Sequence, residues 1–393
     1  MFNVPLTLGI EEEYQIIHPE SRDLHSYVQE FLNQGQQVFP DGQLKPEFMQ
    51  SQVEVGSYVC RDVTELRSEV VRLRKKVYSL AEENNLQFAA ASTHPFASWS
   101  TQNITAGERY RELLDQLQGV AQQLLIFGMH IHVGIGDSPQ HKNLMIEIMN
   151  QLRYFLPHIL ALSSSSPFWQ GRNTGLKSYR SVIFEMMPRT GIPQTFTSYS
   201  EYEDFVDVLG AAGTITGKDG SGKPDATKIW WDVRPHPKFG TLEIRVPDLC
   251  TRIDDAVCIA ALIQAIVAKL IKLREQNQSW RQYRRHHIVE NKWRAMRYGV
   301  EGKLIDFGKR EAVPMHFLGM ELKELVDDVV DDLGSREDVA YIEQILTEGS
   351  SADRQIRVYQ RILAEGGTET EALNGVVDHL VKETMEGIEP PAS

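Results

Sequence analysis

Cysteine is scarce in this 393-residue chain, in which only Cys60, Cys250 and Cys258 occur. No two of them have the spacing of a zinc-binding or redox motif. An odd, sparse set does not suit a secreted fold stabilised by disulfides, so we expect a reducing, cytoplasmic environment.

Long hydrophobic runs are also scarce. Residues 1–5 lack the basic region and the apolar core of a signal peptide. The most hydrophobic stretch, Ala256–Leu273, is barely long enough to span a bilayer, and it carries Gln264, Lys269 and Lys272. We expect a buried core helix there and no membrane partner.

Positive charge is outnumbered, with 41 Lys and Arg residues against 54 Asp and Glu residues and a net charge of -13. Such a surface repels phosphate backbones and anionic lipid, which argues against nucleic acid as a partner. A small anionic ligand held by a few local arginines remains compatible with this balance.

The length alone would suggest two or three domains. No clear linker divides the chain, however, so we expect a single catalytic domain over residues 1–385, helical from about Ser279, and a disordered tail over 386–393. The polar, glycine-rich stretch Gly210–Lys228 is a candidate mobile lid.

Two kinds of hydrophobic period alternate along the chain. Period-two segments predict strands at Leu6–Ile17, Gln50–Val55, Gln87–Ala91, Met129–Ile135, Ser181–Met186 and Thr241–Val246. Helical periods predict helices at Asp62–Asn84 (with Asp62 as its N-cap), Glu108–Leu125, Lys142–Leu162, Tyr202–Leu209 and Asp254–Glu275. The irregular spacing of these strands favours an α+β fold with a mainly antiparallel sheet backed by helices.

Several predicted strands carry reactive side chains on one face. Glu11 and Glu13 alternate with apolar residues, which places their carboxylates on the same face about 7 Å apart. The pattern recurs with Glu54, which has Glu47 upstream, with His130 and His132, and with Glu243 and Arg245.

Each pattern by itself is compatible with the solvated face of an antiparallel sheet. Together, on neighbouring strands, these side chains would form a cup that binds hard divalent cations and, through them, polyphosphate oxygens. His130 and His132 could instead be a zinc pair, but no third ligand has convincing spacing. The excess of carboxylates favours Mg²⁺, with Mn²⁺ as the alternative.

Three further residues are candidates for substrate or nucleotide binding, together with His132. Arg172 and Arg180 lie in a Ser-, Gly- and Pro-rich region, and their planar guanidinium groups suit carboxylate or phosphate. Surface solubility is the competing interpretation, especially for Arg180. Trp231 could form a ligand wall or could simply pack on the sheet.

Three motifs in order resemble the signature strands of the glutamate–cysteine ligase type 2 family, and more narrowly its bacterial carboxylate–amine ligase branch. They are Gly9–Gln15 (GIEEEYQ), Met129–Gly134 (MHIHVG) and Gly240–Asp248 (GTLEIRVPD). The resemblance implies a glutamine-synthetase-like catalytic sheet, antiparallel and curved into an active-site funnel with helices outside. It also implies ATP-dependent amide formation through an acyl phosphate.

The same resemblance assigns roles to individual residues. By motif, the magnesium ligands would be Glu11, Glu13, Glu54 and Glu243, and the catalytic contacts to metal or phosphate would be His130 and Arg245. The implied substrates are ATP, glutamate or a similar carboxylate, and cysteine or another amine.

Two other functions stay open at this point, namely a phosphotransferase of the related guanidino-kinase architecture and a metal-dependent hydrolase built on His130 and His132. Apolar strips on the late helices could form a homodimer or pack on the sheet.

Overall fold

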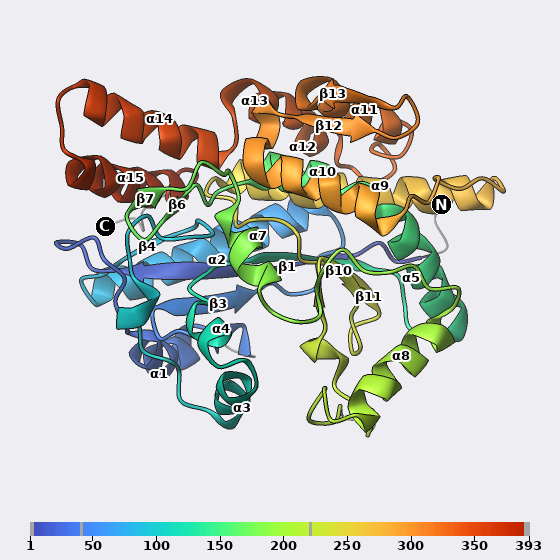
Figure 1. Cartoon of the computed structure of the whole chain (residues 1–393), viewed down its shortest axis with the longest axis horizontal. Helices are drawn as coiled ribbons and strands as arrows, with labels where there is room; N and C mark the ends of the chain where they lie inside the picture. The colour runs from blue at the N-terminus through green and yellow to red at the C-terminus, as the bar shows by residue number, and fades with distance from the viewer. Residues whose placement is uncertain (1–3, 40–41, 220–221, 389–393) are drawn as a thin grey trace.

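The computed structural model describes residues 4–39, 42–219 and 222–388 (Figure 1). Its centre is a seven-stranded sheet with the order β10-β11-β5-β1-β3-β2, in which β4 pairs with the last residues of β1. The strands are β1 (Leu8–Ile17), β2 (Leu44–Pro46), β3 (Gln52–Gly56), β4 (Gln87–Ala89), β5 (Met129–Gly134), β10 (Val233–Pro235) and β11 (Thr241–Ile244). Every pairing in this sheet is antiparallel, and helices flank it. The predicted α+β class is therefore confirmed.

Two long helices cover the apolar face of the sheet. Helix α2 (Val63–Glu83) packs against β1, and α9 (Ile253–Glu275) packs against β5. The Asp62 side chain accepts a hydrogen bond from the Glu65 amide at 2.9 Å, which confirms the predicted N-cap. Helix α9 has the length and hydropathy of a membrane span, but 83% of its most apolar window is buried inside the protein. It is the core helix that the sequence predicts.

A buried ion pair fixes which face of β1 is turned toward helix α2 and which is turned toward the polar side of the sheet. Glu12 lies on the apolar face and is 1% exposed, and it pairs with the fully buried Arg74 of α2. Arg74 also donates to the Cys250 carbonyl at 3.0 Å. Because strand side chains alternate, anchoring Glu12 toward α2 directs Glu11 and Glu13 to the opposite, polar face.

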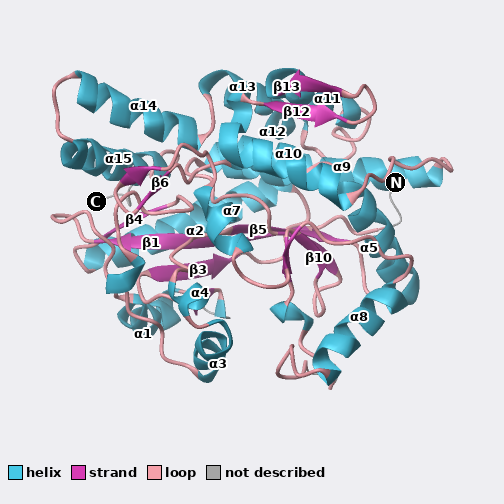
Figure 2. Ribbon diagram, viewed as in Figure 1, coloured by secondary structure: helices cyan, strands magenta, loops and turns pink. Residues whose placement is uncertain are grey.

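The C-terminal third forms a helical layer along one side of the molecule, whereas α1 (Val28–Val38) and α8 (Tyr199–Ala211) lie at the opposite side of the view (Figure 2). This layer contains α10 (Arg285–Tyr298), α11 (Met315–Val326), α12 (Arg336–Ala340), α13 (Ile342–Glu348), α14 (Ser351–Ala364) and α15 (Glu369–Thr384).

The expectation of helix throughout this third is wrong at one hairpin, formed by β12 (Lys303–Asp306) and β13 (Glu311–Pro314). The Asp306 side chain closes its turn by accepting the amides of Gly308 and Lys309 at 2.8 and 3.0 Å.

Three other predicted elements differ from the structure. The strand expected at Ser181–Met186 is α7 (Tyr179–Glu185), because so short an alternation also fits a half-buried helix. The helix expected at Glu108–Leu125 divides into α3 (Glu108–Leu117) and α4 (Gly119–Gln122) at Gln118, whose φ is +50°. The helix expected at Lys142–Leu162 divides into α5 (Pro139–Leu152) and α6 (Leu156–Ser163), where Pro157 cannot donate to a preceding turn.

The remaining elements are short. They include the hairpin of β6 (Phe168–Trp169) and β7 (Arg172–Asn173) and the parallel pair of β8 (Thr190–Gly191) and β9 (Trp230–Trp231). Ile388, within the tail expected over 386–393, is 7% exposed and packs in the core. Residues 389–393 lie outside the described residues.

Candidate active site

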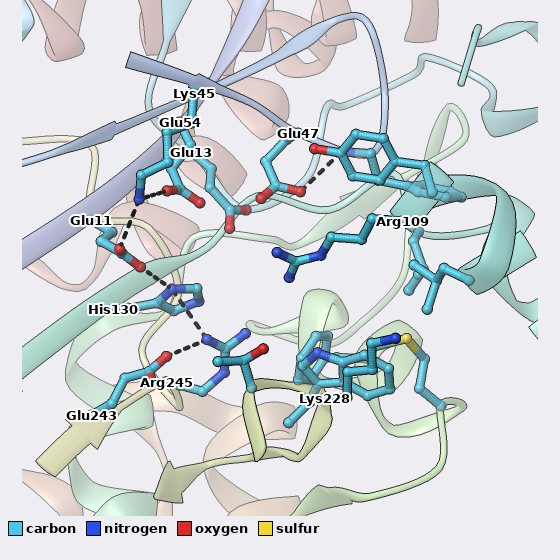
Figure 3. Close-up of a pocket in the computed structure, with 18 of the residues that line it drawn as sticks. Glu11, Glu13, Lys45, Glu47, Glu54, Arg109, His130, Lys228, Glu243 and Arg245 are labelled. Atoms are coloured by element: carbon cyan, nitrogen blue, oxygen red, sulfur yellow. Dashed lines mark hydrogen bonds and ion pairs between the residues drawn. The ribbon is translucent and has the colours of Figure 1, made fainter. Parts of the chain in front are cut away.

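A cavity of about 460 Å³ opens on the polar face of the sheet (Figure 3). Its floor comes from β1, β3, β5 and β11, and its walls come from α3, α7 and the segment between Asp225 and Phe239. The strands that the sequence identified as chemically unusual are therefore neighbours around one space.

Strand register brings the reactive side chains together. Glu13 of β1 is paired with Glu54 of β3, and Glu11 is paired with His130 of β5. On the other side of β5, His132 is paired with Glu243 of β11. Directly paired residues in antiparallel strands have neighbouring side chains, so these pairs line up across the sheet.

Three carboxylates converge at one end of the cavity. Glu13, Glu47 and Glu54, here called the Glu13 group, each offer an oxygen within 4.8 Å of the others. Burial and the charge of Glu54 raise the pKa of Glu13 to about 7. Burial and the charges of Glu13 and Glu54 raise the pKa of Glu47 well above its usual value. A divalent cation would relieve this repulsion, and three carboxylates are the oxygen donors that Mg²⁺ or Mn²⁺ prefers.

A second possible ligand set, the Glu11 group, combines Glu11, His132 and Glu243, whose ligating atoms also lie within 4.8 Å of one another. The Nδ1 atom of His132 is 3.0 Å from the Thr241 hydroxyl oxygen, whereas its buried Nε2 has no hydrogen-bond partner within the described ranges. If Nδ1 carries the proton, Nε2 presents a lone pair to a cation.

The two carboxylates of the Glu11 group are held ionised. Burial alone would raise the pKa of Glu11, but the His130 and His132 rings, whose nearest nitrogens lie 3.2 and 3.9 Å from its carboxylate, outweigh it and lower that pKa well below its usual value. Burial opposes ionisation of Glu243 as well, yet the charges of Arg234 and Arg245 lower its pKa well below the usual value. Both carboxylates are therefore available as anionic ligands near neutral pH.

Arg245 links Glu243 to His130. Its guanidinium bonds the Glu243 carboxylate, and its Nη1 lies 3.4 Å from His130 Nδ1. Burial and the Arg245 charge lower the pKa of His130 to about 4, so the imidazole is neutral at pH 7. Its Nδ1 is also 3.2 Å from Glu11, and a neutral ring either accepts from Arg245 or donates to Glu11 through that atom.

Arg180 of α7 completes the cationic side of the site. It is 3% exposed, and its Nη2 donates to the Arg245 carbonyl at 3.2 Å. The ring of Phe184 lies 5.5 Å from the Arg180 guanidinium and 5.9 Å from that of Arg245. The buried Nε atoms of both arginines lack hydrogen-bond partners among the described residues. Two such donors suit an incoming oxyanion.

Gly128 lets the side chains of Arg180, His130 and Glu13 lie this close together, because it has no side chain of its own. A Cβ at this position would lie 3.0 Å from Arg180 Nη2, 3.1 Å from His130 Nε2 and 3.4 Å from Glu13 Oε2. Its own amide donates to Glu13 at 2.6 Å. No sequence signal marked Gly128, because its importance comes from the side chains that three other segments bring to it.

The structure brings together most, but not all, of the predicted site residues. Those that line the cavity are Glu11, Glu13, Glu54, His130, Arg180, Glu243 and Arg245. His132 belongs to the Glu11 group but does not line the cavity.

Two candidates lie elsewhere. Arg172 is an exposed residue of β7, away from the cavity lining. Trp231 packs against Phe196 and Phe205, with ring centroids 5.8 and 5.4 Å away, while its neighbour Trp230 lines the cavity. Trp230 and Trp231 differ in this way because adjacent strand residues point to opposite faces.

Several lining residues were missed by sequence reasoning, namely Lys45, Arg109 and Arg234. Lys45 lies opposite Glu54 in the β2–β3 pairing, and its ammonium is 2.7 Å from that carboxylate. Arg234 lies opposite Glu243 in the β10–β11 pairing and bonds it at 2.7 and 3.1 Å. Only strand pairing reveals these partners.

Comparison with known proteins places the chain in a family. The family model described as glutamate-cysteine ligase family 2 matches residues 7–382. A protein from Herpetosiphon aurantiacus named "Putative glutamate--cysteine ligase 2" is 54% identical over 384 residues, covering 98% of this chain and 94% of that protein. A protein of the same name from Roseiflexus sp. is 51% identical, covering 98% of this chain and 96% of its own.

Solved structures share the fold at low identity. The glutamate–cysteine ligase of Francisella tularensis, crystallised with AMP, aligns with a TM-score of 0.64 at 11% identity over 99% of this chain and 94% of that chain. A bifunctional glutathione synthetase from Pasteurella multocida also has a TM-score of 0.64, at 14% identity over 97% of this chain and 53% of that chain.

Proposed function

The chain belongs to glutamate–cysteine ligase family 2, and from this membership and the site geometry we propose that it is an ATP-dependent carboxylate–amine ligase. The proposed reaction joins the γ-carboxylate of glutamate to the amine of cysteine or a related amine, with ATP as co-substrate. The names of the relatives support the reaction class. The identity of the amine is part of the proposal.

One observation carries the proposal. Two ligand groups, one of three carboxylates and one of two carboxylates and an imidazole, adjoin the same cavity as the buried guanidinium groups of Arg180 and Arg245. Phosphoryl transfer needs concentrated negative charge to be neutralised and aligned, and it does not need a protein nucleophile. This arrangement suits a polyphosphate far better than it suits a neutral substrate.

The donor atoms of both groups fit divalent cations. Glu13, Glu47 and Glu54 would hold one Mg²⁺ or Mn²⁺, and Glu11, His132 and Glu243 would hold another. Bound there, the cations would supply neutralising charge for the phosphates of ATP.

The chemistry proposed for the substrates has two balanced steps. A carboxylate oxygen of glutamate attacks the γ-phosphorus of ATP, and the bond from that phosphorus to the β–γ bridging oxygen breaks. ADP departs, and glutamate becomes an acyl phosphate. The neutral amine then attacks the acyl carbon, inorganic phosphate departs with the bonding electrons, and the nitrogen loses a proton. Arg180 and Arg245 are placed to bind the anionic oxygens, and a neutral His130 can hold Arg245 by accepting its N–H at Nδ1.

The decisive experiment incubates the protein with ATP, Mg²⁺, glutamate and a panel of amines, and follows ADP, phosphate and amide. Amine-dependent ADP release with an equal amount of new amide is the expected result. A phosphorylated guanidine would instead identify a phosphotransferase, and amide cleavage without ATP would identify a hydrolase. Either of these outcomes contradicts the proposal.

A further inference from the structure

Helix α3 forms one wall of the cavity although it is scarcely anchored. Tyr110, Leu113 and Gln116 line the cavity from this helix. No residue of α3 is buried, in contrast to the long core helices. Its apolar side therefore rests against the ligand space and the edge of the core rather than inside the core.

Polar contacts tether α3 at two points. The Tyr110 hydroxyl donates to the Pro46 carbonyl at 2.8 Å, next to the Glu13 group. Farther along, Glu112 accepts from Lys228 at 3.0 Å and from Thr216 at 3.2 Å. The helix thus bridges the segment that carries Glu47 and the segment that precedes β9.

Arg109 extends from α3 toward the middle of the cavity (Figure 3). Three other cations of the lining are engaged, since Lys45 pairs with Glu54, and Arg234 and Arg245 pair with Glu243. Arg109 makes no hydrogen bond or ion pair with any side chain that the structure describes. Its guanidinium is therefore free to meet a ligand.

We propose that Arg109 binds an oxyanion of the substrates, either a phosphate of the nucleotide or a carboxylate of the amino acid, from the α3 side of the cavity. Arg180 approaches from α7 and Arg245 from the residue after β11, so a bound anion would be contacted from separate walls. The planar fork of Arg109 suits either group, and the tethers of α3 keep it within reach. This inference rests on the proposed function.

The test measures the binding of Mg·ADP and of L-glutamate separately, by isothermal titration calorimetry on the full-length protein. Arg109→Met is expected to weaken one of the two affinities by about tenfold or more, as the loss of a charge-assisted hydrogen bond predicts. Weaker Mg·ADP binding identifies the phosphate contact, and weaker glutamate binding identifies the carboxylate contact. Arg109→Lys keeps the charge and should retain part of the affinity.

Arg111→Met is the matched control, because Arg111 lies on the same helix, is exposed and does not line the cavity. It should leave both affinities unchanged. If Arg109→Met left both affinities within about twofold of wild type, or if Arg111→Met weakened them equally, the role of Arg109 would be refuted. A wild-type protein that binds neither ligand would instead overturn the proposed function.

Discussion

Lys292 forms a buried ion-pair network that links the segments carrying the two cavity arginines, Arg180 and Arg245. This α10 residue is 3% exposed, and its ammonium lies 2.8 and 2.6 Å from the two carboxylate oxygens of Asp232 and 2.7 Å from Glu185 of α7. The Asp232 carbonyl in turn accepts the Arg245 amide at 2.8 Å. One ammonium group therefore connects the helix that carries Arg180 with the backbone that carries Arg245.

Lys292→Met should lower the free energy of unfolding by about 3–5 kcal/mol, the usual cost of removing one partner from a buried ion pair. The Asp232 carboxylate, itself 4% exposed, would be left without its cation, and its pKa, which burial already raises, would rise further. The double variant Lys292→Met/Asp232→Asn should recover much of the loss, because it leaves no unpaired buried charge.

Urea denaturation of the single and double variants measures these energies. Lys269→Met is the control, since Lys269 pairs with the 44%-exposed Asp328 on the surface, and it should cost less than about 1 kcal/mol. A Lys292→Met loss no larger than the Lys269→Met loss would refute this account of the network. So would a double variant as unstable as the sum of its single changes.

Three further results are expected. In thermal unfolding, Mg²⁺ should raise the unfolding temperature more at pH 8 than at pH 6. Glu13 has its pKa raised to about 7, so below that pH it binds a proton that competes with the cation. An equal rise at both pH values would contradict this. Gly128→Ala should lower kcat/KM by about tenfold or more with little loss of secondary structure, because the new methyl group displaces Arg180 and His130; wild-type activity would show that these side chains tolerate displacement. Glu11→Gln should abolish amide formation while circular dichroism stays unchanged, and retained turnover would remove Glu11 from the metal assignment.

Period-two patterning made much of the fold predictable. Alternating residues in Leu6–Ile17 and Met129–Ile135 identified strands with one apolar and one reactive face, and both are strands of the central sheet. Where the alternating segment was short, as in Ser181–Met186, the pattern fitted both a strand and a helix, and the structure has a helix there. That helix carries Arg180, whose burial no local pattern could indicate.

The residues of β1, β5 and β11 that share a face could be predicted without a structure, because side-chain direction along a strand follows from the backbone geometry alone. Three motifs in order also sufficed to indicate the family. The folded chain was needed to show which strands are neighbours and in what register, and hence that Glu13 lies beside Glu54 and Arg234 beside Glu243. The position of Arg109 in the cavity also became visible only in the fold. It depends on how α3 packs against the sheet, and these two elements come from segments far apart in the chain.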